Sequence, residues 1–251
     1  MPRVGELLLY GDISDFSWWG DEVTPKQFHE DLQALGDIDE LHVFINSRGG
    51  DIFAGQAIHS MLKRHKAQVV VYVDGLAASA ASVVAMAGNV IRMPRNAMMM
   101  IHNAWTIALG NAEEFRKVAD TLDQIGKAIM AAYQEKTGMP EEEIAVLMNA
   151  ETWMTAEEAV AMGFADEIEE AKQVAASLNG KLLVVNGQQH DLSRYRHPPK
   201  LEFLPSSLEA QRPPAAPDPP NNTPTGERQL PLSLYERRLR LRQLEGRVAS
   251  R

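Results

Sequence analysis

The sequence contains no cysteine, which excludes disulfide bonds, thiolate-metal sites and a cysteine nucleophile. Any covalent catalysis must therefore use serine, threonine, lysine or a carboxylate. Long apolar runs are also missing. The amino-terminal run covers only residues 7–10, and no stretch reaches the roughly 20 apolar residues that cross a membrane. We therefore expect a soluble, cytoplasmic protein with no membrane partner.

Proline is scarce at first and then abundant, since ten of the fourteen prolines lie in residues 198–231. Such a segment cannot form a packed core. Residues 228–251 carry seven arginines against two glutamates, although the whole chain has a net charge of −9. That net charge argues against direct nucleic-acid binding. We predict a folded domain over residues 1–190, a disordered linker over 191–229 and a basic amphipathic docking helix over 230–251.

Short apolar runs alternate with amphipathic stretches up to about residue 170, which is typical of βα units and predicts an α/β fold. The predicted strands are residues 41–46, 68–74, 97–102 and 164–170, with 181–187 as a further candidate. The predicted helices are residues 51–66, 76–88, 111–138, 139–151 and 155–163. The longest has the clearest ends, because Asn111 can cap its start and Gly138 its end.

The segment VDGLAASAAS (73–82) places Ser79 in an early turn of a predicted helix, after a buried strand. A serine there lies near unpaired backbone N–H groups and the positive end of the helix, which suits a developing oxyanion. This geometry suits the nucleophile of an acyl transfer. Taken alone, the segment also fits a serine that is only a small spacer in an alanine-rich helix.

A second candidate is INSRGGDIFAG (45–55), in which a strand ends, turns at Gly49 and Gly50, and enters a helix. Paired glycines leave two main-chain N–H groups unhindered, which favours an anion or oxyanion cradle. An ordinary tight turn between strand and helix would have the same pattern. No Gly-Lys-Ser follows, so the segment is not a phosphate-binding loop.

The third candidate is His102 in MMMIHNAW (98–105), at the end of an apolar strand. A single histidine there would more often be a structural hydrogen-bonding residue. Here, however, polar groups follow three successive strands, and the carboxyl ends of strands in α/β folds converge on one crevice. We therefore expect Ser79, His102 and the glycine pair to meet. The other histidines show no metal-like spacing, so we predict no metal and no cofactor.

These motifs resemble the proteolytic subunits of Clp proteases, whose patterns INSPGG, GQAAS and MIH stand here as INSRGG, GLAAS and MIHNA in the same order. The resemblance covers roughly residues 5–170 and implies a ClpP/crotonase-like spiral of βα units. It implies Ser79 as nucleophile, His102 as general base, and the amides near Gly49, Gly50 and Ala80 as the oxyanion hole.

The third residue of the catalytic triad, an acid that pairs with the histidine, is harder to identify from the sequence. The family places an aspartate before a string that matches TWMTA (152–156), and the corresponding residue here is Glu151. A glutamate can still orient the imidazole and stabilise its charged form. Asn149, Asp166 or a water are alternatives for this role, and Glu151 could instead be an exposed carboxylate at the end of a helix.

Two positions depart from the family pattern. Arg48 replaces the usual proline, which relaxes the backbone and is expected to add a cation beside the substrate groove. Ala80 stands where other members usually have methionine, a change that we expect to matter little because the oxyanion contact comes from the amide.

The closest resemblance is to Clp-like proteases of tailed-phage head-assembly operons, through MMMIHNAW, GNAEEFRK and ETWMTAEEAVAMGFAD. It implies a serine endopeptidase that cleaves a scaffold or a capsid propeptide, in the bacterial host cytoplasm or the assembling procapsid. It also implies a ring-forming homo-oligomer, and we expect no ATP-dependent unfoldase to be needed. Two alternatives are a crotonase-like acyl-CoA enzyme and a non-enzymatic head-assembly or scaffold-binding protein.

Overall fold

The computed structural model describes residues 2–17, 20–170, 176–179, 182–185, 188–193 and 195–198. The predicted linker beyond residue 198 and the predicted helix 230–251 lie outside the described residues. In the part of the chain that the structure describes, no helix is both long and apolar enough to cross a membrane.

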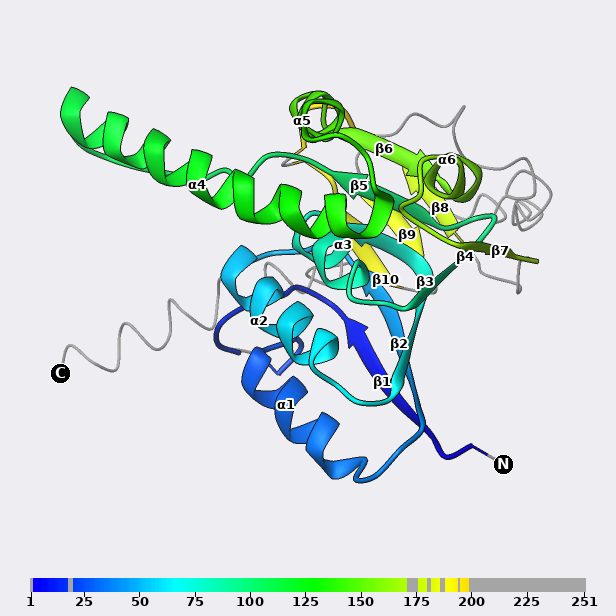
Figure 1. Ribbon diagram of the computed structural model, residues 1–251. Helices are drawn as coiled ribbons and strands as arrows, with labels where there is room; N and C mark the ends of the chain where they lie inside the picture. Colours follow the sequence, from blue (N-terminus) through cyan, green and yellow to red (C-terminus); the bar gives the residue numbers. More distant parts are fainter. Residues whose placement is uncertain are drawn as a thin grey trace, which may run out of the picture. The chain divides into compact units, whose positions relative to one another are not determined.

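The core of the domain is a mainly parallel sheet (Figure 1). Five of its strands lie in the order β1-β2-β3-β4-β7 and pair in parallel. The far end of β3 pairs with β5, which in turn pairs antiparallel with β6. The bounds are β1 Val4–Tyr10, β2 Glu40–Ser47, β3 Gln68–Ala78, β4 Val90–Pro94, β5 Met98–Ile101, β6 Thr152–Thr155 and β7 Glu167–Glu169. The long strand β3 therefore joins two parts of the sheet.

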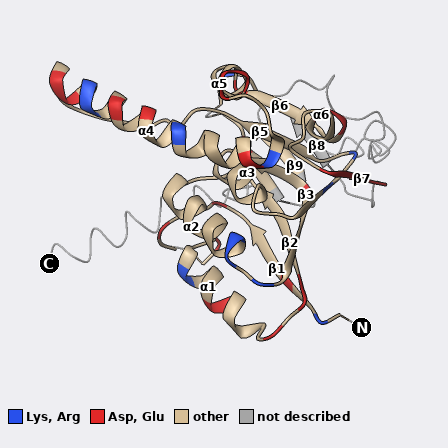
Figure 2. Ribbon diagram, in the orientation of Figure 1, with Lys and Arg blue, Asp and Glu red and all other residues tan. Residues whose placement is uncertain are grey.

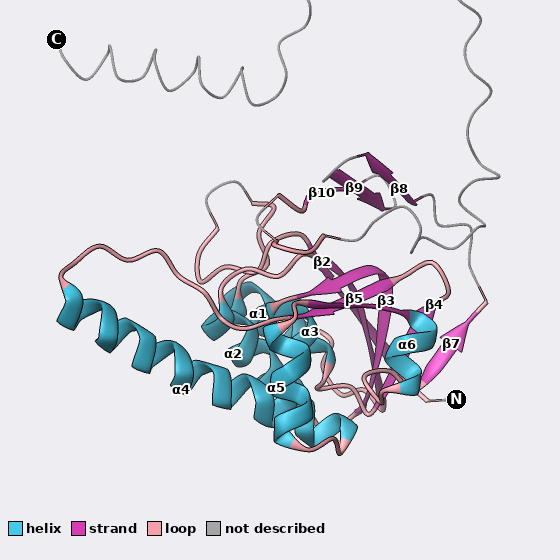
Figure 3. Cartoon of the chain, turned by 90° about the horizontal axis from the view of Figure 1, so that it is seen from above, coloured by secondary structure: helices cyan, strands magenta, loops and turns pink. Residues whose placement is uncertain are grey.

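The helices cover one face of this sheet, as the view from above shows (Figure 3). Their bounds are α1 Pro25–Ala34, α2 Ile52–Lys63, α3 Ala80–Ala85, α4 Ala112–Thr137, α5 Glu141–Asn149 and α6 Ala156–Ala161. The main hydrophobic core lies between helices and sheet, and strand residues such as Val43, Val71 and Met99 pack there with helix residues. The uncharged helix α3 is fully buried, whereas several positions along the projecting part of α4 are charged residues (Figure 2).

A small antiparallel sheet lies on the opposite side of the main sheet (Figure 3). It consists of β8 Ala176–Asn179, β9 Leu182–Val185 and β10 Gln188–Asp191. Leu183, Leu192 and Tyr195 form a second buried cluster with Leu76, Ala78, Met98 and Met100 of β3 and β5. The packed part of the chain thus continues at least to Tyr195. The predicted boundary at residue 190 falls too early, because these apolar side chains cover a sheet face that would otherwise be exposed.

Most of the predicted elements are confirmed. The strands predicted over 41–46, 68–74 and 97–102 correspond to β2, β3 and β5. Helix α4 begins after an Asn111 capping box and is followed by Gly138 in the left-handed conformation. The helix predicted over 76–88 is wrong at its start. Leu76, Ala77 and Ala78 pair with β5, so they remain in β3, and the helix begins only after Ser79. A continuous run of small and apolar residues does not mark this boundary between strand and helix.

Candidate active site

Ser79 occupies a sharp turn between β3 and α3. Its φ of 56° and ψ of −126° lie in a region that residues with side chains rarely adopt. The turn is held by the Ser79 N–H, which donates to the Met100 carbonyl at 2.9 Å, and by the Ser79 carbonyl, which accepts from Ser82 Oγ at 2.6 Å. A strained turn from strand to helix presents a serine hydroxyl outside the helix, where a substrate can reach it.

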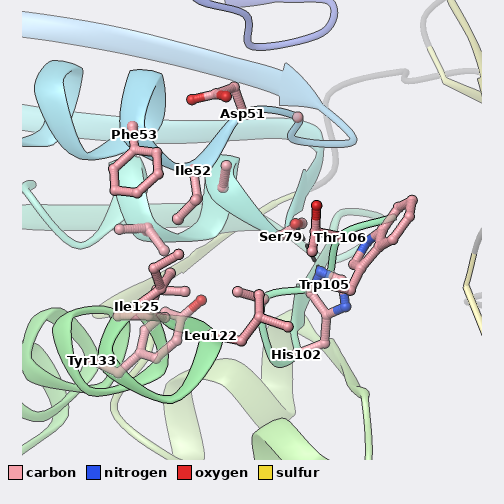
Figure 4. A pocket seen from close by; sticks show the side chains of 15 residues that line it. Asp51, Ile52, Phe53, Ser79, His102, Trp105, Thr106, Leu122, Ile125 and Tyr133 are labelled. Carbon is pink, nitrogen blue, oxygen red and sulfur yellow. Dashed lines mark hydrogen bonds between the residues drawn. The ribbon is translucent and has the colours of Figure 1, made fainter. Parts of the chain in front are cut away.

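His102 follows β5 and contacts this hydroxyl directly. The distance from His102 Nε2 to Ser79 Oγ is 2.8 Å, within the reach needed for a general base. Backbone pairing explains the contact, because Ala78 and Met100 are register partners in β3 and β5. The two side chains face each other across the mouth of a pocket (Figure 4).

The glycine turn packs against Ser79 so closely that a side chain would not fit. At Gly49, where φ is 84°, a Cβ atom would lie 2.8 Å from both the Ala80 nitrogen and the Ser79 Cβ. At Gly50, where φ is 152°, it would lie 2.0 Å from the Ile13 carbonyl oxygen. Both glycines are therefore required for close backbone approach as well as for their φ angles.

The three expected oxyanion amides differ in their hydrogen bonds. The Gly49 N–H donates to Ser47 Oγ at 3.0 Å, so it is already used inside the protein. The N–H groups of Gly50 and Ala80 donate to no other group among the described residues. Both residues line the pocket beside Ser79. In this conformation Gly50 and Ala80 are the amides available to a bound oxyanion.

The pocket has a volume of about 370 Å³ and places the Ser79 and His102 side chains next to an apolar interior. Its deeper wall combines Ile52 of α2 with Leu122, Ile125 and Tyr133 of α4 (Figure 4). The Tyr133 hydroxyl bonds to Ser82 Oγ at 2.8 Å, and burial raises the pKa of Tyr133. The pocket is suited to an apolar side chain or acyl group next to the serine.

Glu151 is buried, with only 8% of its surface exposed, and has a φ of 54°. Its carboxylate accepts hydrogen bonds from the main-chain N–H groups of Arg196 at 3.0 Å and His197 at 2.7 Å. Among the described residues, it has no hydrogen bond with His102. Glu151 thus anchors the carboxyl-terminal segment, and its assignment as the acid of the triad stays a prediction.

The two alternative side chains for the acid are also engaged elsewhere. Asn149 Oδ1 accepts from Asn103 Nδ2 at 2.7 Å. Asp166 accepts from the Ile91 N–H at 2.6 Å and from Lys136 Nζ at 2.7 Å. Asp166 therefore fixes the junction of β4 and α4.

Arg48 was expected to add a cation beside the substrate groove, but in the structure its charge is paired within the protein. Its guanidinium forms two hydrogen bonds of 2.6 Å with the Asp12 carboxylate, and this pairing raises the pKa of Arg48. A third contact, of 3.4 Å, joins Arg48 Nη1 to the Asp191 carbonyl. Arg48 therefore ties the glycine turn to the end of β1 and to β10, because an ion pair satisfies the charge better than an open groove.

Two residues near the site were not identified from the sequence. The buried His190 in β10 lies 3.1 Å from Asn46 Oδ1, and burial lowers the pKa of His190 to about 4. The rings of Tyr195 and His102 pack in a T-shaped arrangement, with 5.6 Å between ring centroids. No local pattern marks either residue, and Tyr195 falls in the segment predicted to be a linker. Within the described residues, no three His, Asp or Glu side chains gather as a metal site would require.

A serine hydrogen-bonded to a histidine, beside two available amides and an apolar pocket, defines a candidate site for acyl transfer. The family model described as Clp protease matches residues 22–172. The chain belongs to the Clp protease family, and its mainly parallel α/β architecture is consistent with the fold of that family.

Individual relatives agree with this assignment. The chain is 28% identical over 153 residues to an ATP-dependent Clp protease proteolytic subunit of Bacteroides fragilis, covering 59% of this chain and 74% of the relative. It is 30% identical over 131 residues to a protein of the same name from Deinococcus radiodurans, covering 51% of this chain and 64% of that relative.

Proposed function

We propose that this chain is a serine endopeptidase in which Ser79 is the nucleophile and His102 the general base. Membership of the Clp protease family supports a peptidase of the serine type. The observation that carries the residue assignment is the 2.8 Å hydrogen bond between Ser79 Oγ and His102 Nε2. The free N–H groups of Gly50 and Ala80 beside it provide the second requirement of acyl transfer.

The reaction follows from this arrangement. His102 Nε2 removes the Ser79 proton as Oγ attacks a peptide carbonyl, and the Gly50 and Ala80 N–H groups stabilise the resulting oxyanion. The protonated imidazole then gives its proton to the leaving amine, which breaks the C–N bond. Water, deprotonated by the same imidazole, attacks the acyl-enzyme and releases the second product. Glu151 is the predicted acid, and its carboxylate also accepts the Arg196 and His197 N–H groups.

For substrates, we propose capsid-assembly proteins, either a scaffold or a capsid propeptide, cleaved without an ATP-dependent unfoldase. The support is the resemblance of three segments, MMMIHNAW, GNAEEFRK and ETWMTAEEAVAMGFAD, to phage-encoded Clp-like proteases. Co-expression with a phage scaffold protein and a phage capsid protein tests this proposal. Cleavage of either protein by the wild type but not by Ser79→Ala would support it, and two intact proteins would contradict it.

We also propose a homo-oligomeric ring. In the loop before α4, the exposed fraction of Ile107 is 84% and that of Leu109 is 95%. Phe115, in the first turns of α4, is half exposed. Apolar side chains gathered on one loop and helix start are typical of an interface. Native mass spectrometry of wild type and of Ile107→Ser/Leu109→Ser tests this. We expect a single closed oligomer for the wild type and smaller species for the variant.

The assignment of Ser79 and His102 is tested with a fluorophosphonate probe, with the adduct located by mass spectrometry. We expect labelling at Ser79 in the wild type and none in Ser79→Ala or His102→Ala. Glu151→Gln shows whether that carboxylate contributes, since an acid of the triad would reduce the labelling rate strongly. If a known serine peptidase labels in parallel and this protein does not, an acyl-CoA enzyme or a binding protein becomes the better account.

A further inference from the structure

After β10, the side chain of Tyr195 contacts residues of the candidate active site. Tyr195 is only 3% exposed, and its hydroxyl donates to the Arg48 carbonyl at 2.5 Å. Its ring meets the rings of His102 and Trp153 edge to face, at centroid distances of 5.6 and 5.4 Å. One side chain therefore contacts both the residue before the glycine turn and the histidine that bonds to Ser79.

The contact with Arg48 matters because of the chemistry of the peptide bond. The Arg48 carbonyl and the Gly49 N–H belong to one planar group, so a bond to one fixes the direction of the other. Gly49 and Gly50 both have positive φ angles, and glycine resists rotation less than any other residue. Restraints from outside the turn must therefore set its orientation. Tyr195 holds the carbonyl side of this peptide, and Ser47 Oγ holds the N–H side.

Tyr195 is itself fixed from both sides along the chain. Leu192, three residues earlier, is fully buried in the second cluster. The next two residues, Arg196 and His197, give their N–H groups to the Glu151 carboxylate. A hydrogen bond to a charged acceptor is stronger than one between neutral groups, so Glu151 anchors the segment that holds Tyr195.

We propose that Tyr195 is a positioning residue, which orients the Arg48–Gly49 peptide through its hydroxyl and the His102 ring through their T-shaped contact. This inference rests on the proposed function, because it assigns Tyr195 a role in the acyl transfer at Ser79. Tyr195 touches no reacting atom. Its effect passes through the glycine turn, whose geometry sets where the Gly50 amide points.

The test compares Tyr195→Phe with a matched control, Tyr72→Phe. Each variant loses one hydroxyl that is hydrogen-bonded and nearly buried, since the Tyr72 hydroxyl accepts from Arg92 Nη1 at 2.9 Å, away from Ser79. We expect similar melting temperatures for the two variants. For inactivation by an alkyl fluorophosphonate, we expect Tyr195→Phe to lower the maximal rate about fivefold, the loss of one buried hydrogen bond, with the apparent affinity for the probe unchanged. Tyr72→Phe should keep the wild-type rate.

A second readout does not depend on activity. Hydrogen exchange followed by mass spectrometry reports on the peptide that spans residues 47–51, and we expect faster exchange there in Tyr195→Phe than in Tyr72→Phe. Equal inactivation rates with equal exchange would overturn the inference, as would rate losses that simply follow the melting temperature in both variants. If the wild type itself is not labelled, the proposed function fails, while the exchange comparison still decides whether Tyr195 holds the turn.

Discussion

The two sides of the Ser79 and His102 pair are built in different ways. On one side, the glycine turn and the start of α3 bring Gly50 and Ala80 next to the serine, all from short motifs at the ends of β2 and β3. On the other side, Tyr195, Glu151 and His190 come from late parts of the chain and contact the site through packing and hydrogen bonds. In the proposed mechanism, the first side carries the reacting groups and the second holds them in place.

This difference predicts that variants on the first side remove activity, whereas variants on the second side reduce it or change stability.

Ser79→Ala should have the largest effect. Loss of the nucleophile in a serine peptidase costs about 10⁴- to 10⁶-fold in kcat. Peptide or ester hydrolysis by the purified oligomer measures it, and native mass spectrometry shows whether assembly is intact. Activity within tenfold of wild type would mean that the nucleophile is another residue.

Gly49→Ala should have the next largest effect. The new Cβ would lie 2.8 Å from the Ala80 nitrogen, so the turn must move away from Ser79 and displace an oxyanion donor. Losing one such donor costs about 10²- to 10³-fold in kcat. The control is Gly126→Ala in α4, where a Cβ meets nothing within 4 Å. A Gly49→Ala variant that melts like the control and keeps its kcat would show that the turn does not form the oxyanion hole.

On the second side, His190 should make the stability of the folded protein depend on pH. Its folded pKa of about 4 lies below the ordinary value of 6.5, so the unfolded chain binds the proton more readily between these values. Stability should therefore fall as the pH drops from about 6.5 towards 4. Between pH 7 and pH 5, we expect His190 to account for a loss of about 2 kcal/mol in the free energy of unfolding.

Urea unfolding of wild type and His190→Gln at both pH values measures this contribution. Glutamine keeps a donor for Asn46 but does not titrate, so the variant should lose less stability on acidification than the wild type. The exposed His29→Gln variant serves as control and should follow the wild type. Identical pH dependence in all three proteins would show that His190 is protonated as easily in the folded state as in the unfolded chain.

Arg48→Ala should have the smallest effect of this series. It removes the ion pair with Asp12 and the contact with Asp191, while Tyr195 still holds the Arg48 carbonyl. Because the pair is partly exposed, we expect a loss of about 1 kcal/mol in stability and less than tenfold in kcat. The control is Arg95→Ala, whose ion pair with Glu157 lies on the surface. A loss of kcat as large as that of Gly49→Ala would show that Arg48 binds substrate.

The sequence predicted much of the first side. The ends of β2 near Asn46 and of β5 near His102 were readable from apolar runs, and parallel strands bring such ends to one edge of a sheet. The start of α3 was misplaced by four residues, from 76 to Ala80, because Leu76 and its neighbours suit a strand and a helix equally well. The role of Arg48 was also missed, since a charged residue in a turn gives no sign of which carboxylate it will meet.

The sequence by itself was enough to predict the α/β class and to single out Ser79, His102, Gly49 and Gly50. Strand periodicity and the steric needs of a turn act over a few neighbouring residues, so local patterns reveal them. Only the tertiary structure decided that Glu151 accepts from residues 196 and 197, and that Tyr195 packs on His102. These contacts join residues that can be well over forty positions apart. They depend on which faces of the sheet the carboxyl-terminal segment covers, and no local pattern encodes that choice.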